Sequence, residues 1–220
     1  MNKSLIEPFY HLTLIVGRVT PKGVNMLGTG FLMNAEGLVA TTYHAIGNDA
    51  SNLVVLMARK MKANDYQDMS DTQCKLVEAK PFEIDPVRDI AILKTTLQWT
   101  GELPRLGNLD TCNIADSVGI FGYPHCTQGR RAFTFQATEV GAKVLMDNQG
   151  IKSRHAVINT QARPGQSGSP VIDSSNGLIL GMLIGAWVPG PAGVILGDIN
   201  PYELHQTTHC ISAHHIKEML

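Results

Sequence analysis

Short apolar runs separated by turn-forming residues dominate this sequence and restrict it to a β-sheet architecture. The runs recur about every 10 to 20 residues, a spacing typical of barrels and sandwiches. Between them lie segments such as Asn34–Gly37 and Asp173–Gly177, whose residues favour tight turns. The sequence therefore predicts an all-β fold. The runs are Leu12–Val16, Met26–Met33, Gly37–Thr42, Leu53–Ala58, Ile90–Lys94, Val118–Gly122, Ala132–Gln136, Ala156–Thr160, Val171–Asp173 and Leu178–Trp187.

Helical spacing occurs only near the two ends of the sequence. In Ser4–Leu12 and Ser212–Leu220 a serine precedes apolar residues three and four positions apart, which predicts two short helices. The stretch 98–107 has no such period and contains a proline and two glycines. We therefore expect a linker there, between a domain of residues 1–100 and a domain of residues 101–220.

The charge and cysteine content exclude several classes of protein. The 220 residues include 18 basic and 19 acidic side chains, and 44% of them are hydrophobic. This balance excludes a disordered chain and a polycationic nucleic-acid binder. The four cysteines, at positions 74, 112, 126 and 210, are scattered and form no C-x-x-C pair. A reducing compartment is the best fit, so we expect a cytoplasmic protein without a disulfide framework.

Two stretches could be taken for a secretory signal or a membrane-spanning helix, but their sequences do not favour either interpretation. Met1–Gly17 lacks the long apolar run of a secretory signal. Gly177–Gly197 contains no charge, but Pro189 and Pro191 argue against a helix there. We instead expect a turn between two buried strands, Leu178–Trp187 and Val194–Leu196, and no membrane partner.

Several histidines gather toward the end of the chain beside Cys210. His205, His209, His214 and His215 raise the possibility of a metal site. Their spacing follows no structural-zinc pattern, and such a site needs four converging ligands. We therefore expect neither a metal nor any other cofactor.

The strongest chemical signal is the segment Pro164-Gly-Gln-Ser-Gly-Ser-Pro170, which lies between two predicted strands. A serine between glycines is typical of a sharp bend. Glycine conformations allow the amides of Gly165 and Ser167 to point into one concavity and hold an oxyanion, while the Ser167 hydroxyl attacks a carbonyl. Taken alone, the segment fits a glycine- and serine-rich β-turn equally well.

A serine nucleophile needs an imidazole to accept its proton and a carboxylate to orient that imidazole. His44 follows the predicted strand Gly37–Thr42, and Asp89 precedes the predicted strand Ile90–Lys94. Each residue alone is compatible with an ordinary turn. Together the three residues stand in the order His, Asp, Ser.

This arrangement resembles the trypsin/chymotrypsin-like serine peptidases, most closely their HtrA/Deg branch. Gly28–Leu32 and Gly37–His44 are similar to the stretch that leads to the catalytic histidine of that branch. Asp85–Ala91 resembles its D-x-x-x-D-I-A motif, with Asp89 in the position of the catalytic acid. Phe121–Pro124 and Pro164–Pro170 resemble its second-barrel G-x-P element and its serine elbow.

The resemblance implies a chymotrypsin-like fold of two perpendicular six-stranded β-barrels. His44 and Asp89 would lie on the N-terminal barrel and Ser167 on the C-terminal barrel. The implied activity is that of a serine endopeptidase acting on proteins or peptides, with a regulatory protein partner also possible. An inactive peptide-binding module on the same fold is the alternative.

The resemblance also implies a substrate-binding site. Gln161 would form the floor of the pocket for the side chain before the scissile bond, and Ile184, Gly185 and Ala186 would form its wall and a peptide-binding edge. Gln161 is neutral, so we expect no strong selection for arginine or lysine. Two positions depart from the family pattern: Gln166, where Asn or Asp is frequent, and Ser169, where Gly is usual.

Overall fold

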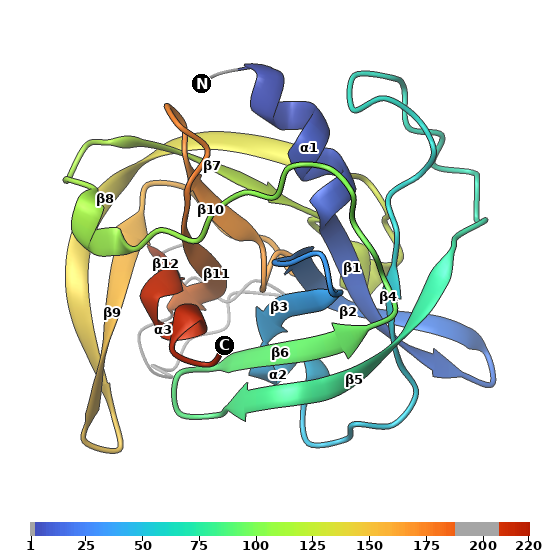
Figure 1. The fold of residues 1–220 in the computed structure, drawn as a ribbon, viewed down its shortest axis with the longest axis horizontal. Helices are drawn as coiled ribbons and strands as arrows, with labels where there is room; N and C mark the ends of the chain where they lie inside the picture. Colours follow the sequence, from blue (N-terminus) through green and yellow to red (C-terminus); the bar gives the residue numbers. More distant parts are fainter. Residues whose placement is uncertain (1–2, 188–206) are drawn as a thin grey trace, which may run out of the picture.

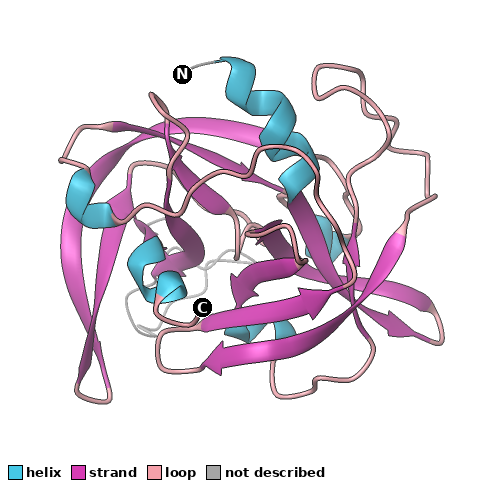
Figure 2. Cartoon of the chain, viewed as in Figure 1, coloured by secondary structure: helices cyan, strands magenta, loops and turns pink. Residues whose placement is uncertain are grey.

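A computed structural model describes residues 3–187 and 207–220, which form two closed barrels of six strands each (Figures 1 and 2). The strand order is β1-β2-β3-β6-β5-β4 in the first barrel and β10-β11-β12-β9-β8-β7 in the second. All neighbouring strands are antiparallel. The first barrel contains β1 (Thr13–Thr20), β2 (Gly23–Leu32), β3 (Leu38–Thr42), β4 (Leu53–Leu56), β5 (Leu76–Asp85) and β6 (Ile90–Thr95). The second contains β7 (Ser117–Gly122), β8 (Thr134–Asn148), β9 (Ile151–Ile158), β10 (Pro170–Asp173), β11 (Ile179–Trp187) and β12 (Thr207–Ser212).

The predicted all-β class with two six-stranded barrels is confirmed, as are the short helices near both ends. Ile6–Leu12 forms α1, after a 3-10 turn at Lys3–Leu5, and Ala213–Lys217 forms α3. A further short helix, α2 (Tyr43–Ile46), and 3-10 turns at Leu109–Thr111 and Cys126–Gln128 were not predicted. None of the described helices is long and apolar enough to cross a membrane.

Two of the strands, β5 and β12, were not predicted from the sequence. β5 is mostly exposed, with Ala79 as its one fully buried residue, and its register shifts between Pro81 and Glu83. Charged residues and Pro81 interrupt its apolar residues, so this strand lacks the apolar run that marks the others. β12 is short and polar at its start. The predicted strand Val194–Leu196 lies outside the described residues.

An aromatic cluster fills the region between the barrels. Phe9 of α1 stacks on Phe121 of β7 with ring centroids 4.9 Å apart, and Phe133 stacks on the same ring at 5.7 Å. Tyr10 meets Phe133 edge to face at 5.0 Å. These buried rings belong to the same core cluster as Ile15 and other first-barrel residues. The first helix thus packs both barrels together, and that packing brings the two halves of the candidate site into one place. The exact domain boundary near residue 100 stays a prediction.

Candidate active site

The end of β3 and the start of β6 bring His44 and Asp89 together. Thr42 pairs with Ile90, and just beyond this pair the Tyr43 amide donates to the Asp89 carbonyl at 3.2 Å. The His44 amide donates to Asp89 Oδ1 at 2.7 Å, and His44 Nδ1 lies 2.6 Å from Asp89 Oδ2. A carboxylate only accepts hydrogen bonds, so Nδ1 is the donor, and in the neutral ring Nε2 presents its lone pair. This is the orientation that a general base requires.

The turn before β6 distinguishes two nearby aspartates. Asp85 accepts the amides of Val87 and Arg88 through Oδ1 at 3.1 and 3.0 Å, and its Oδ2 lies 2.8 Å from the Arg88 guanidinium. Asp89 has a φ of +58°, a conformation that aspartate tolerates better than most residues. Asp85 therefore shapes the turn, while Asp89 faces the histidine.

The elbow segment, residues 164–170, consists of two consecutive four-residue turns. The Gln166 amide donates to the Arg163 carbonyl, and the Ser169 amide donates to the Gln166 carbonyl, each at 3.0 Å. Gly165 (φ +91°) and Gly168 (φ +89°) occupy the third position of each turn, where a type II turn needs a positive φ. A Cβ on Gly168 would lie 1.9 Å from the Thr29 carbonyl oxygen, so only glycine fits there.

The turns leave two amides unused. The Gly168 amide donates to the Leu183 carbonyl at 2.7 Å, which fixes the end of the second turn. Within the described part of the chain, the amides of Gly165 and Ser167 donate to no acceptor. These are the two amides that the sequence analysis assigned to an oxyanion hole.

Thr29 of β2 holds the elbow against the first barrel. Its amide donates to the Ser167 carbonyl at 2.9 Å, and its hydroxyl donates to the Gly165 carbonyl at 2.7 Å. The same hydroxyl accepts the Tyr123 amide at 3.2 Å. Sequence reasoning placed Thr29 in a motif but missed this role, because nothing in the sequence shows which distant carbonyls a strand residue will meet.

Gly28 separates Ser167 from the residue next to the histidine. A Cβ on Gly28 would lie 3.1 Å from the Ser167 carbonyl oxygen and 3.3 Å from Ala45 Cβ. The two barrels thus bring the serine segment beside the histidine segment. Among the described contacts there is no hydrogen bond between the half-buried Ser167 hydroxyl and the His44 ring, which is half exposed.

The predicted substrate residues of β11 lie beside the serine. Ser167 Oγ is 3.8 Å from the position that a Cβ on Gly185 would take. Ile184 is partly buried at a register shift in β11, and Ala186 is exposed. β10 pairs with β11 only up to Met182, and beyond Leu183 the described residues give that edge of β11 no strand partner. Gln161 is exposed in the loop after β9.

The two departures from the family pattern are accommodated locally. The buried Gln166 side chain accepts the Arg163 amide at 2.7 Å and donates to Gln136 Oε1 at 2.6 Å. Ser169 is buried, and a Cβ on Gly122 would lie 2.1 Å from its hydroxyl oxygen. The side chain at 169 therefore occupies space that the glycine at 122 leaves open.

His155, His209 and His215 lie close enough together to influence one another, and Asp89 acts on the first of them. The pKa of His155 is lowered to about 4, mainly by burial and then by His209 and His215, while the charge of Asp89 acts in the opposite direction. Nδ1 of His155 and Nδ1 of His209 are buried without a hydrogen-bond partner. Burial also lowers the pKa of His209 and of His215. These imidazoles are therefore neutral near pH 7.

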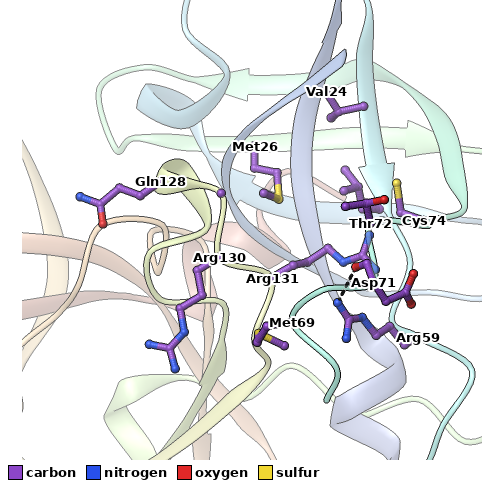
Figure 3. Close-up of a pocket in the computed structure, with 12 residues that line it drawn as sticks. Val24, Met26, Arg59, Met69, Asp71, Thr72, Cys74, Gln128, Arg130 and Arg131 are labelled. Atoms are coloured by element: carbon purple, nitrogen blue, oxygen red, sulfur yellow. Dashed lines mark hydrogen bonds between the residues drawn. The ribbon is translucent and has the colours of Figure 1, made fainter. Parts of the chain in front are cut away.

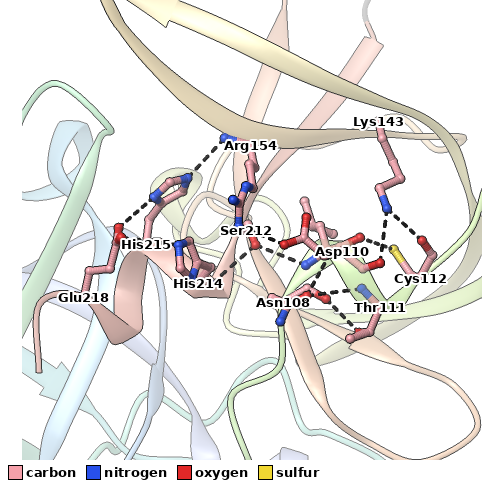
Figure 4. A network of polar contacts seen from close by, with 11 residues as sticks. Asn108, Asp110, Thr111, Cys112, Lys143, Arg154, Ser212, His214, His215 and Glu218 are labelled. Carbon is pink, nitrogen blue, oxygen red and sulfur yellow. Dashed lines mark hydrogen bonds and ion pairs between the residues drawn. The ribbon is translucent and has the colours of Figure 1, made fainter.

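His214, His215 and Glu218 come close enough to suggest a metal site, with ligand atoms within 4.8 Å of one another (Figure 4). However, Nε2 of His215 accepts the Arg154 amide at 3.1 Å, so the ring proton is on Nδ1, which faces Glu218 at 3.0 Å. A protonated nitrogen is no metal ligand. The network instead ties α3 to β9. His205 lies outside the described residues, and His209 bonds Thr207.

Cys126 packs on the elbow but is unsuited to be a nucleophile. Its thiol is buried, and burial raises its pKa to about 12. The His125 ring contacts Gln128 at 3.0 Å. His125 and Cys126 are therefore structural residues of the turn after β7.

Comparison with known proteins agrees with this geometry. The family profile described as a trypsin-like peptidase domain matches residues 28–182. A probable periplasmic serine endoprotease, DegP-like, of Chlamydia trachomatis serovar D is 31% identical over 178 residues, covering 76% of this chain and 30% of that protein. The magnetosome formation protease MamE of Magnetospirillum gryphiswaldense is 23% identical over 184 residues, covering 83% of this chain and 22% of that protein. The chain spans about a quarter of the length of the curated relatives that it matches.

Among solved structures, the active form of the Rv3671c protease from M. tuberculosis superposes with a TM-score of 0.70. The sequence identity is 21%, and the match covers 100% of this chain and 83% of that one. This likeness supports the fold of two barrels.

Replacing Thr29 with valine removes the hydroxyl without changing the shape of the side chain. We expect Thr29→Val to lower the free energy of unfolding by about 1–3 kcal/mol, because the Gly165 carbonyl and the Tyr123 amide lose their buried partner. Urea unfolding measures the change. Thr29→Ser keeps the hydroxyl and is the matched control; equal losses in both variants would contradict this role.

The pKa of His155 predicts a dependence of stability on pH. The imidazole takes up a proton near pH 6.5 in the unfolded chain but only near pH 4 in the folded chain. The free energy of unfolding therefore falls as the pH drops from about 6.5 to about 4. In urea unfolding across this range, we expect a shallower slope for His155→Gln than for the wild type. Equal slopes for wild type and His155→Gln would refute the assignment.

Proposed function

Because the chain belongs to the trypsin-like peptidase family, we propose that it is a serine endopeptidase that hydrolyses peptide bonds of protein substrates. The observation that supports this best is the His44–Asp89 contact of 2.6 Å beside an elbow with two unused amides. Ser167 would be the nucleophile, His44 the general base and then acid, and Asp89 the residue that orients the imidazole.

The chemistry follows from these positions. Nε2 of His44 takes the proton of the Ser167 hydroxyl as Oγ forms a bond to the carbonyl carbon. The negative charge on the carbonyl oxygen is held by the amides of Gly165 and Ser167, each contributing roughly 3–4 kcal/mol of transition-state stabilisation. His44 then protonates the leaving amine as the C–N bond breaks. Water, activated by the same nitrogen, hydrolyses the acyl-enzyme and restores the serine.

The unpaired edge of β11 supports binding of the substrate as an added strand. A peptide extended along Ile184–Ala186 would form backbone hydrogen bonds there and place its carbonyl beside Ser167. Gly185 and Ala186 leave room for a side chain, and Gln161 offers no charge. These features favour small to medium apolar side chains before the scissile bond.

The alternative is a peptide-binding module with little or no turnover. The missing hydrogen bond between Ser167 and His44 is the observation in its favour. Such bonds are often long in unliganded sites and tighten only when substrate binds, so we prefer the active enzyme.

We propose that the protein acts in a reducing compartment, the cytoplasm, on one or a few proteins, under the control of a regulatory partner. All four cysteines are free, and Cys74 is exposed. An exposed thiol persists best where disulfides are kept reduced.

A fluorophosphonate probe tests the active-enzyme proposal. It reacts only with a serine whose hydroxyl is activated, so we expect one label per wild-type molecule and none on Ser167→Ala. Ser169→Ala is the matched control, because this neighbouring hydroxyl is buried and lacks a hydrogen-bond partner. Mass spectrometry of the intact protein counts the labels. A folded wild-type protein that stays unlabelled would favour the peptide-binding module.

A peptide library tests the specificity. We expect cleavage after small and medium apolar residues, with arginine and lysine depleted by about tenfold or more, because no charge pairs with them in the pocket. Sequencing of the products by mass spectrometry gives the preference. Cleavage dominated by arginine or lysine would overturn the assignment of Gln161 to the pocket floor.

A further inference from the structure

A cavity of about 750 Å³ lies between β2, the loop of residues 57–75 and the segment 128–131 (Figure 3). Its apolar lining comes from Val24, Met26, Leu56 and Met69. Met69 is 48% exposed, a high value for so apolar a side chain. The volume lies in the range of pockets that bind ligands. None of its lining residues belongs to the elbow, and neither His44 nor Asp89 lines it.

The cavity is also strongly basic. Arg59, Arg130 and Arg131 line it, with Asp71 as the one acidic residue in the lining. Arg59 donates to the Asp71 carbonyl at 3.0 Å, and Arg131 donates to the Gln73 carbonyl at 2.6 Å, so both guanidiniums are held in place. The exposed Arg130 side chain forms no hydrogen bond or ion pair within the described residues. Its charge is available to a ligand.

Hydrogen bonds within the protein hold the walls of the cavity in place without a ligand. In the segment 128–131, the Gln128 and Arg130 amides both donate to the His125 carbonyl, at 2.9 and 3.2 Å. The loop 57–75 is held to the second barrel by a reciprocal pair. Gln67 donates to the Phe133 carbonyl at 2.9 Å and accepts the Phe133 amide at 2.8 Å. Such preorganisation reduces the entropy lost on binding.

We propose that this cavity is a second binding site, specific for an acidic peptide segment with interspersed apolar side chains, contributed by a partner protein. The apolar lining receives the aliphatic side chains, and Arg130 pairs with a carboxylate at the rim. The proposal goes beyond the proposed function and does not depend on catalysis.

Cys74 provides a direct readout, because it lines the cavity and is exposed, whereas the other three cysteines are buried. The test uses the full chain with Ser167→Ala, so that no peptide is cut. Alkylation of Cys74 by iodoacetamide is followed by mass spectrometry with and without the peptide acetyl-Glu-Leu-Glu-Leu-Glu-Leu-amide. We expect the rate to fall about tenfold when the peptide is in about tenfold excess over its Kd.

Matched controls make the result specific. A peptide with lysine in place of every glutamate should not protect Cys74. Arg130→Glu should abolish protection by the acidic peptide, whereas Arg105→Glu, at an exposed arginine outside the cavity, should retain it. The proposal is overturned by absence of protection, by equal protection from both peptides, or by protection that persists in Arg130→Glu. Protection by dodecanoate but not by the peptide would overturn it in favour of a fatty-acid site.

Discussion

The candidate site depends on the hydrogen bonds between Thr29 and the elbow. His44 and Asp89 meet within the first barrel, because β3 and β6 are paired neighbours. The elbow belongs to the second barrel and reaches the first through the amide and hydroxyl of Thr29, which bond the carbonyls of Ser167 and Gly165. The amides that share a peptide unit with these two carbonyls, those of Gln166 and Gly168, donate to the Arg163 and Leu183 carbonyls. Thr29 therefore fixes the position of the Ser167 segment against the first barrel.

The residues that motifs identify were predictable, and those that depend on three-dimensional contact were not. The resemblance of Asp85–Ala91 to the family's D-x-x-x-D-I-A motif singled out Asp89, and the structure places that carboxylate 2.6 Å from His44 Nδ1. The apolar runs predicted most strands but not β5, whose outward-facing charges and Pro81 hide its pairing. Thr29 and Leu183 hold the elbow through hydrogen bonds to its backbone groups. Residue identity does not show which backbone groups a distant residue will bond, so only the structure reveals these contacts.

The two proposed binding surfaces differ in character. The edge of β11 offers backbone groups and small side chains, features that accept many sequences. The cavity beside residues 128–131 combines methionines with arginines, a lining that discriminates by charge as well as by size. Selectivity for a particular protein is easier to build from the second surface than from the first, because charge pairing separates ligands more sharply than one or two methylene groups do.

The contact between Gly122 and Ser169 constrains how this chain can evolve. A Cβ at 122 and a hydroxymethyl group at 169 would occupy the same space, with 2.1 Å between the built Cβ and the hydroxyl oxygen. The two positions are therefore coupled. A side chain at 122 requires Ser169 to change its rotamer or to be replaced by a smaller residue, so homologues should show the two positions exchanging bulk in step.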